Sequence, residues 1–200
     1  MSATMDLMNI GSGFAAPVLD SQAVFRRALH ALSRPGEIVQ IDCSAGLPSC
    51  LHAAAGALLL VLLDQDTRVW FTPSIDDQAI SYLRFHTGCV LVERQTDADV
   101  AVVGAAHDLP PLASFALGTE EYPERSATVV VQVETLTTDA GWTLQGPGIA
   151  RQASLAAGGL DEVFVREWRA VQRFFPRGMD LFLACGARLA GLPRTTRIEA

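Results

Sequence analysis

The residues best suited to bind an anion lie close together near the end of the chain. Residues 193–197 read Pro-Arg-Thr-Thr-Arg, which places two guanidinium groups and two hydroxyl groups in one short segment. Arginine binds phosphate or phosphonate oxygens through two parallel N–H groups, and hydroxyl groups add further donors. The alternative is an exposed terminal segment whose arginines pair with acidic residues elsewhere in the protein. Composition alone leaves both interpretations open.

Other patterns that could carry chemistry are weaker. Cys50, His52, His86 and Cys89 could in principle bind zinc, but their spacing matches no common zinc motif, so we expect no metal site. The chain has no Gly-X-Ser-X-Gly nucleophile motif. Residues 146–148, Gly-Pro-Gly, could direct N–H groups at a phosphate, but a tight turn is the simpler interpretation.

The charged residues exclude several functions. All 15 basic residues are arginines, so neither a Schiff base with pyridoxal phosphate nor a P-loop can form within this chain. The net charge of −7 disfavours general nucleic-acid binding. Residues 1–162 hold 8 arginines against 19 acidic residues, whereas residues 163–200 hold 7 against 3. This basic end could meet an anionic substrate or an acidic partner, although a solvated helix face would also explain it.

Cysteine usage and hydropathy indicate the compartment. The 4 cysteines are too few and too scattered for a disulfide framework, so we expect reduced thiols and a cytoplasmic protein. The N-terminal segment carries an acidic residue and no basic one, so it does not resemble a secretory signal. The longest apolar run, residues 51–63, is too short to cross a bilayer and predicts a buried helix.

Hydrophobic periodicity and breaker residues predict the elements that must position these side chains. Helices are expected over residues 20–33, 48–63, 76–84 and 161–173, with Asp20 and Asp76-Asp77 as N-terminal caps and Pro48 beginning the second helix. Strands are expected over residues 37–41, 67–72, 89–93, 100–103, 126–133, 142–145, 179–185 and 188–192.

The order of these elements predicts the fold class. Strands alternate with helices through the first hundred residues, and the last two strands form a hairpin around Gly186-Ala187. This pattern predicts an α/β fold, a three-layer sandwich with a mixed sheet. The strand over residues 179–185 is apolar on both faces, so both faces should be covered. We expect residues 1–13 to form a flexible tail and residues 14–200 to form one domain.

An ordered set of segments resembles one protein family over about residues 14–198. The segments are residues 20–36, 63–67, 83–87, 118–119, 122–124, 144–149 and 175–196. Each is a weak motif alone, but their order is specific. Together they resemble the PhnH family, a component of the bacterial carbon–phosphorus lyase system for phosphonate use.

The resemblance implies a fold akin to the large domain of pyridoxal-phosphate-dependent transferases, without the cofactor site. It also implies a homodimer that joins subunits G, I and J in a core complex, in which subunit I acts with help from G, this chain and L. That complex replaces the adenine of MgATP by a phosphonate and so forms a ribose 1-phosphonate 5-triphosphate. We expect no cofactor on this chain itself and no nucleic-acid or membrane partner.

The resemblance assigns no established catalytic residue. Matched polar positions give His86, Arg84 and Glu124 as catalytic candidates, and Arg194, Thr195 and Arg26 as anion-binding or partner-binding candidates. Two alternatives to a co-catalytic subunit stay open. One is a separate enzyme that acts on a small phosphorylated substrate, and the other is a purely structural assembly subunit.

Overall fold

The elements of the fold follow the predicted order in a computed structural model, which describes residues 10–199. Its helices are α1 (Pro17–Ser33), α2 (Ala53–Leu62), α3 (Asp77–Thr87) and α4 (Glu162–Gln172). Its strands are β1 (Val39–Gln40), β2 (Arg68–Phe71), β3 (Val90–Leu91), β4 (Val100–Val103), β5 (Thr128–Gln132), β6 (Leu136–Gln145), β7 (Ala153–Ala157), β8 (Asp180–Cys185), β9 (Arg188–Leu192) and β10 (Arg197–Glu199). The predicted α/β class is confirmed.

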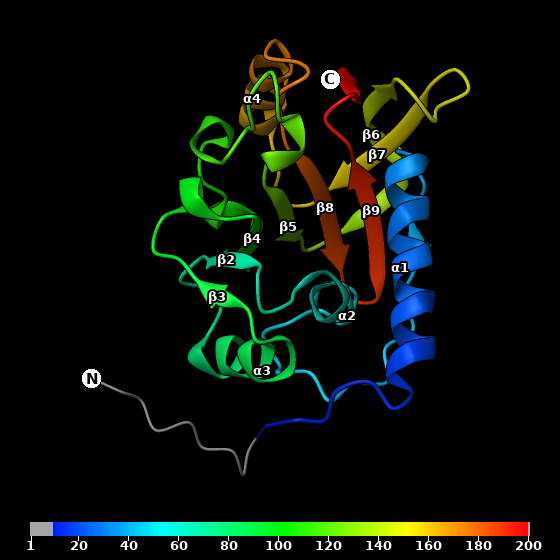
Figure 1. Ribbon diagram of the computed structural model, residues 1–200. Coiled ribbons are helices and arrows are strands. Elements are labelled where there is room, and N and C mark those ends of the chain that lie inside the picture. The colour runs from blue at the N-terminus through cyan, green and yellow to red at the C-terminus, as the bar shows by residue number, and fades with distance from the viewer. Residues whose placement is uncertain (1–9, 200) are drawn as a thin grey trace.

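A seven-stranded mixed sheet in the order β1-β9-β8-β5-β4-β2-β3 forms the centre of the molecule (Figure 1). Neighbouring strands from β8 to β3 run parallel, while β9 pairs antiparallel with both β8 and β1. The predicted hairpin is present, since Leu183 of β8 pairs with Ala190 of β9. A second sheet has three antiparallel strands in the order β10-β6-β7.

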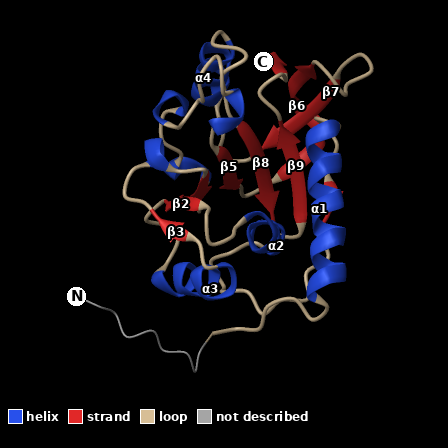
Figure 2. Ribbon diagram, in the orientation of Figure 1, coloured by secondary structure: helices blue, strands red, loops and turns tan. Residues whose placement is uncertain are grey.

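Two hydrophobic cores lie on opposite faces of the large sheet. One core joins the sheet to α1, α2 and α3, and the other joins it to α4 and the small sheet. Strand β8 serves both cores, because Leu181 and Leu183 lie in one while Phe182 and Ala184 lie in the other. The expectation that this strand is covered on both faces is therefore confirmed, and Figure 2 shows helices on either side of the sheet.

Two predicted helix starts are wrong. Helix α1 begins at Pro17, a residue whose fixed φ suits the first turn of a helix, and Asp20 lies within that turn. The Asp20 carboxylate accepts the Ala16 N–H (3.0 Å) and the Ser44 hydroxyl (2.8 Å). These bonds, with the Ala16 contribution the larger, lower the pKa of Asp20.

Helix α2 begins at Ala53 rather than at Pro48. Pro48 instead starts a turn in which its carbonyl accepts the Leu51 N–H. Asp76 caps α3 as predicted, because its side chain accepts the Ala79 N–H at 2.8 Å.

The small sheet is largely absent from the sequence prediction, which gives only residues 142–145 as a strand. Strand β6 covers ten residues and pairs with both β7 and β10. The Gly-Pro-Gly segment after β6 is a tight turn: Gly148 has φ +83°, and a Cβ there would lie 2.1 Å from the Ser33 carbonyl oxygen. The close packing of this turn against backbone supports the simpler interpretation, a tight turn.

Candidate functional site

His86 and Arg84 lie in the last turn of α3. His86 donates its Nε2–H to the Gly11 carbonyl oxygen (3.0 Å), since a carbonyl can only accept. Its ring also contacts the ring of Tyr82, whose hydroxyl donates to the Ser12 carbonyl at 2.9 Å. Burial raises the pKa of Tyr82 to about 12. Both side chains thus hold the segment before α1 against α3, while Arg84 is exposed.

These contacts bear on the predicted tail, residues 1–13. Residues 1–9 of that segment lie outside the part of the chain that the structure describes. The rest of the segment contacts the body of the protein: besides the bonds to His86 and Tyr82, the Ser12 carbonyl accepts the Gly46 N–H at 2.8 Å.

Arg194 directs its guanidinium group at other parts of the protein. Nη2 donates to Asp180 Oδ2 and to Ser126 Oγ, both at 2.6 Å, and Nη1 donates to the Pro123 carbonyl at 2.7 Å. Nε donates to Asp180 Oδ1 at 3.3 Å. The two charged side chains are largely buried, at 17% and 28% exposure. Arg194 therefore fastens the start of β8 to the segment before β5, and its fork is already occupied.

The remaining candidates do not gather around one centre. Glu124 lies in the 3₁₀ turn Pro123–Arg125, whose first carbonyl binds Arg194, but its own side chain is exposed. Arg26 is exposed on α1. In Figure 1, α3 lies at the opposite end of the molecule from the C-terminal strand β10. The sequence candidates therefore belong to at least two separate regions.

A cavity that we name the C-terminal pocket lies between the end of α4 and the segment that leads into β10. It has a volume of about 300 Å³ and is lined by Gln172, Phe175, Arg194, Thr195 and Arg197. Two of these five, Arg194 and Thr195, are predicted anion-binding candidates. The structure thus places Thr195 and Arg197 at an open cavity and Arg194 in its wall.

A second cavity, the strand-end cavity, lies where β4 and β5 end. It has a volume of about 190 Å³, and its lining includes His52, Gly104, His107, Gln132 and Glu134. Ligands of parallel α/β sheets bind at this edge, outside the carboxyl ends of the strands. The topology therefore marks this cavity as a candidate small-molecule site.

Gln132 and His52 fix one wall of the strand-end cavity. Gln132 is only 3% exposed, and its amide donates to the carbonyls of Cys50 (2.8 Å) and Gly104 (3.2 Å) while accepting the His52 N–H. The His52 ring donates Nδ1–H to the Ala184 carbonyl at 3.1 Å. In neutral His52 the other nitrogen, Nε2, then carries a lone pair. It has no hydrogen-bond partner within residues 10–199, so it can accept a hydroxyl or N–H group.

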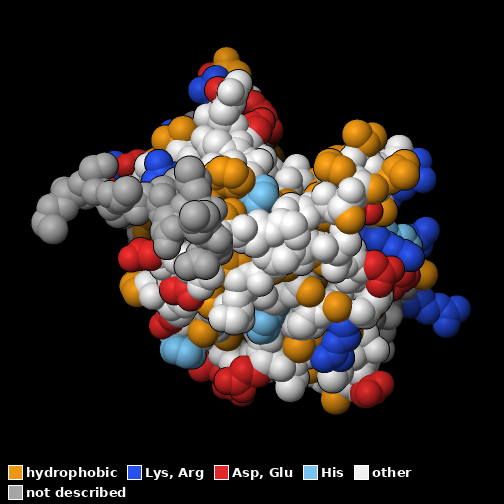
Figure 3. All heavy atoms as spheres, turned by 90° about the horizontal axis from the view of Figure 1, so that it is seen from below, with side chains coloured by type: hydrophobic (Ala, Val, Ile, Leu, Met, Phe, Trp, Pro, Cys, Tyr) orange, Lys and Arg blue, Asp and Glu red, His pale blue; other side chains and the backbone are white. Residues whose placement is uncertain are grey.

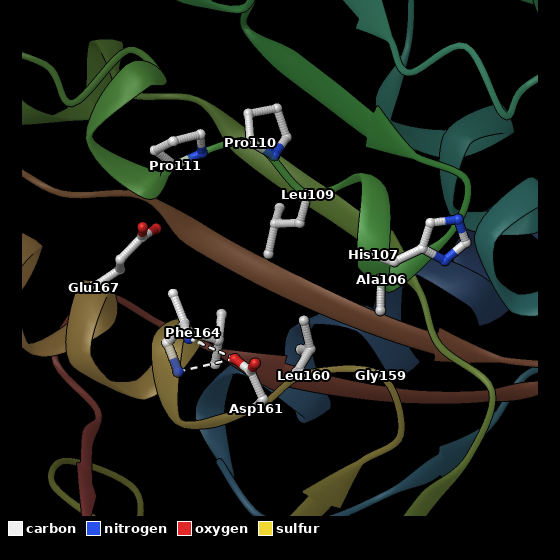
Figure 4. Close-up of a pocket in the computed structure, with 11 residues that line it drawn as sticks. Ala106, His107, Leu109, Pro110, Pro111, Gly159, Leu160, Asp161, Phe164 and Glu167 are labelled. Carbon is white, nitrogen blue, oxygen red and sulfur yellow. Dashed lines mark hydrogen bonds between the residues drawn. The ribbon is translucent and has the colours of Figure 1, made fainter.

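A wider cavity of about 340 Å³ adjoins the strand-end cavity and shares Ala106, His107 and Gly159 with it. Figure 4 shows Pro110 and Pro111 on one side and Asp161, Phe164 and Glu167 across from them. Asp161 caps α4, accepting the Val163 N–H at 2.8 Å, and Glu167 accepts the Leu112 N–H at 2.9 Å. Both carboxylates therefore hold backbone groups in place.

The cysteines and histidines do not form a metal or thiol centre. Across residues 10–199, no group of three or more His, Cys, Asp or Glu side chains lies close enough to hold a metal ion. Burial raises the pKa of the Cys43 and Cys50 thiols, which lowers the fraction of nucleophilic thiolate. Within the same residues, no helix is both long and apolar enough to cross a membrane.

Comparison with known families decides the identity of the chain. A family model described as bacterial phosphonate metabolism protein (PhnH) matches residues 12–199. The chain belongs to the PhnH family. The resemblance seen in the ordered sequence segments is thus confirmed, and the match covers both sheets and all four helices of this PhnH-family fold.

Curated PhnH-family relatives align over most of their length. A protein of Rhizobium meliloti (strain 1021), named alpha-D-ribose 1-methylphosphonate 5-triphosphate synthase subunit PhnH, is 39% identical over 187 residues, 93% of this chain and 94% of the relative. A Stutzerimonas stutzeri protein named "Putative C-P lyase subunit protein HtxG" is 31% identical over 180 residues, 89% of this chain and 85% of the relative.

Sequence reasoning misses His52 and Gln132 of this PhnH-family chain as cavity residues. The signal for Gln132 is a polar side chain that ends the apolar run of β5, at the edge where parallel sheets bind ligands. His52 gives no such signal, because its partner Ala184 lies 132 residues away in sequence.

Proposed function

We propose that the chain is the PhnH component of a synthase that forms ribose 1-phosphonate 5-triphosphate from MgATP and a phosphonate. The observation that carries this proposal is the 39% identity to the Rhizobium meliloti subunit over nearly the whole of both chains. The reaction then belongs to the carbon–phosphorus lyase pathway of phosphonate breakdown, in the cytoplasm. The partners are a second copy of this chain and subunits G, I, J and L.

We infer a supporting role rather than a separate catalytic one. Of the sequence candidates, His86 and Arg194 bind other parts of the protein, which favours a positioning role for both. We infer a fold related to pyridoxal-phosphate transferases from the family resemblance, and the absence of lysine supports the view that this chain holds no such cofactor. ATP and phosphonate are then substrates of the whole complex.

The outer face of α1 is the surface that we assign to assembly. The inner face of α1 is buried and consists of Val24, Ala28 and Ala31. On the outer face, the side chains of Val18, Phe25 and Leu29 are 82%, 45% and 50% exposed. Their spacing places these three side chains in one stripe along the helix. Figure 3 shows hydrophobic and basic side chains reaching the surface on the side where α1 lies in Figure 1. An apolar stripe beside arginines fits a partner surface with an apolar centre and an acidic rim.

A complementation experiment tests the proposed function. In a bacterium that lacks its own PhnH protein, this chain is expected to restore growth on methylphosphonate as the only phosphorus source. Phe25→Glu is expected to reduce this growth by at least tenfold, because it places a charge in the apolar contact. It is also expected to reduce at least tenfold the amount of subunits G, I and J that co-purifies with an affinity-tagged copy of this chain.

Ala23→Glu is the matched control, since residue 23 is also exposed on α1 but lies outside the stripe. It is expected to behave as wild type, and both variants should keep the wild-type melting temperature. No growth with the wild-type chain, when it is expressed and folded, would contradict the proposed function. Equal recovery of partners by the two variants would contradict the role of α1.

A second candidate role is direct contact with a small-molecule substrate in the strand-end cavity, and the unpaired Nε2 of His52 favours it. His52→Asn tests this role, because the asparagine amide can replace Nδ1–H as donor to Ala184 but supplies nothing in place of Nε2. We expect normal assembly and at least a tenfold loss of phosphonate-dependent adenine release by the reconstituted complex. Wild-type adenine release would exclude this contact.

A further inference from the structure

The C-terminal pocket combines an open cavity with one arginine, Arg197, that forms no ion pair among the described residues. Arg194 is neutralised by Asp180, but no carboxylate lies within ion-pair distance of Arg173, Arg177 or Arg197 among the described residues. Arg197 is exposed on β10 and lines the pocket. This end of the chain therefore keeps positive charge available on a protein that is acidic elsewhere.

The buried polar atoms give an independent indication. Across residues 10–199, only two buried side-chain nitrogen or oxygen atoms lack a hydrogen-bond partner: Arg177 Nε and Thr196 Oγ1. Thr196 is fully buried and does not line the pocket, although Thr195 and Arg197 on either side of it in sequence do. Arg177 lines a narrow crevice that shares Gln172 and Arg194 with the pocket. A buried donor without an acceptor costs free energy, so Arg177 Nε indicates a missing acceptor, a ligand or solvent oxygen, at the crevice that adjoins the pocket.

The other walls of the pocket suit a phosphorylated organic molecule. Phe175 lines the pocket and is 63% exposed, so its ring is accessible to a ligand in the cavity. Thr195 contributes a hydroxyl group, and its side chain makes no hydrogen bond within the described part of the chain. The volume of about 300 Å³ is at the lower end of the range for small-molecule sites.

We propose that the C-terminal pocket binds the polyphosphate group of a phosphorylated ligand. Arg197 and the Thr195 hydroxyl contact phosphoryl oxygens, and Phe175 covers the adjoining organic part. Arg194 shapes the pocket wall through its bonds to Asp180 and Pro123. The identity of the ligand rests on the proposed function. In that reaction the substrate ATP and the ribose 1-phosphonate product both carry a triphosphate group.

Calorimetric titration of the purified full chain tests the site, with inorganic tripolyphosphate and ATP as the two probes. We expect both to bind with one-to-one stoichiometry, and ATP to bind more tightly if Phe175 covers its organic part. Arg197→Gln is expected to weaken tripolyphosphate binding by about tenfold or more, because a charge-assisted contact is lost. Thr195→Val is expected to weaken it by a smaller factor.

Arg94→Gln is the matched control, since it removes one exposed arginine away from the pocket. It is expected to leave the affinity within twofold of wild type. Absence of tripolyphosphate binding would overturn the proposal. An equal loss of tripolyphosphate affinity in Arg94→Gln and Arg197→Gln would also overturn it, because it would indicate a general charge effect. Binding is measured without partner subunits, so failed complementation with normal binding would refute the synthase role and not the site.

Discussion

Leu183→Asp is expected to prevent the chain from folding. Leu183 is fully buried in β8, which lies between β5 and β9 near the middle of the large sheet. A carboxylate there would lose its hydration and would face only the apolar side chains of the core. The expected loss exceeds about 4 kcal/mol, which is a large part of the stability of an ordinary domain.

Urea unfolding followed by circular dichroism tests this prediction, because Leu183→Asp is expected to show no cooperative transition. Leu91→Asp is the matched control, because Leu91 is 40% exposed on the edge strand β3, and its expected cost is below about 1 kcal/mol. A soluble Leu183→Asp protein with the wild-type unfolding midpoint would show that β8 is not covered on both faces.

Arg194→Ala is expected to lower the free energy of unfolding by about 2–4 kcal/mol, somewhat less than for a fully buried pair, because both partners are partly exposed. The substitution leaves the Asp180 carboxylate without its counter-ion, and it leaves Pro123 and Ser126 without their donor. Arg194→Lys is expected to fall between alanine and wild type, because one ammonium group cannot reproduce the fork.

The exposed pair Arg94–Asp97 supplies the comparison for this prediction. Its side chains are 72% and 41% exposed, so Arg94→Ala is expected to cost at most about 1 kcal/mol. Similar unfolding midpoints for Arg194→Ala and Arg94→Ala would mean that Arg194 does not hold the fold together, and would return it to the anion-binding candidates.

Elements with a strong local pattern can be predicted from sequence. The β-branched run Val129–Val131 and the apolar segment of β8 fit strands that are buried on both faces. Strands β7 and β10 carry small or polar residues without such a pattern, and their pairing with β6 defines them as strands. The start of α1 is ambiguous from sequence, because a carboxylate such as that of Asp20 suits either the cap or the first turn of a helix.

The site is harder to predict than the fold, because its contacts join distant parts of the chain. Sequence spacing identifies the arginines of residues 193–197 as a group. It cannot show that Asp180 occupies the fork of Arg194, or that Arg197 has no ion-pair partner among residues 10–199. The position of the Gln132 side chain in the cavity wall likewise depends on a hydrogen bond from the backbone of His52, which lies 80 residues away in sequence. Such pairings depend on tertiary structure, which no local pattern encodes.

The position of β9 has a consequence for the order of folding. Strand β1 near the N-terminus pairs with β9 near the C-terminus, and Gly191 of β9 packs against the backbone of Ala31 in α1. The first helix can pack against α2 early, but it lacks its contact with β9 until about 190 residues have been synthesised. Contacts of such long range slow folding and leave apolar surface exposed to other chains meanwhile. During translation, the face of α1 that packs against β9 therefore stays uncovered until the last hairpin has been made.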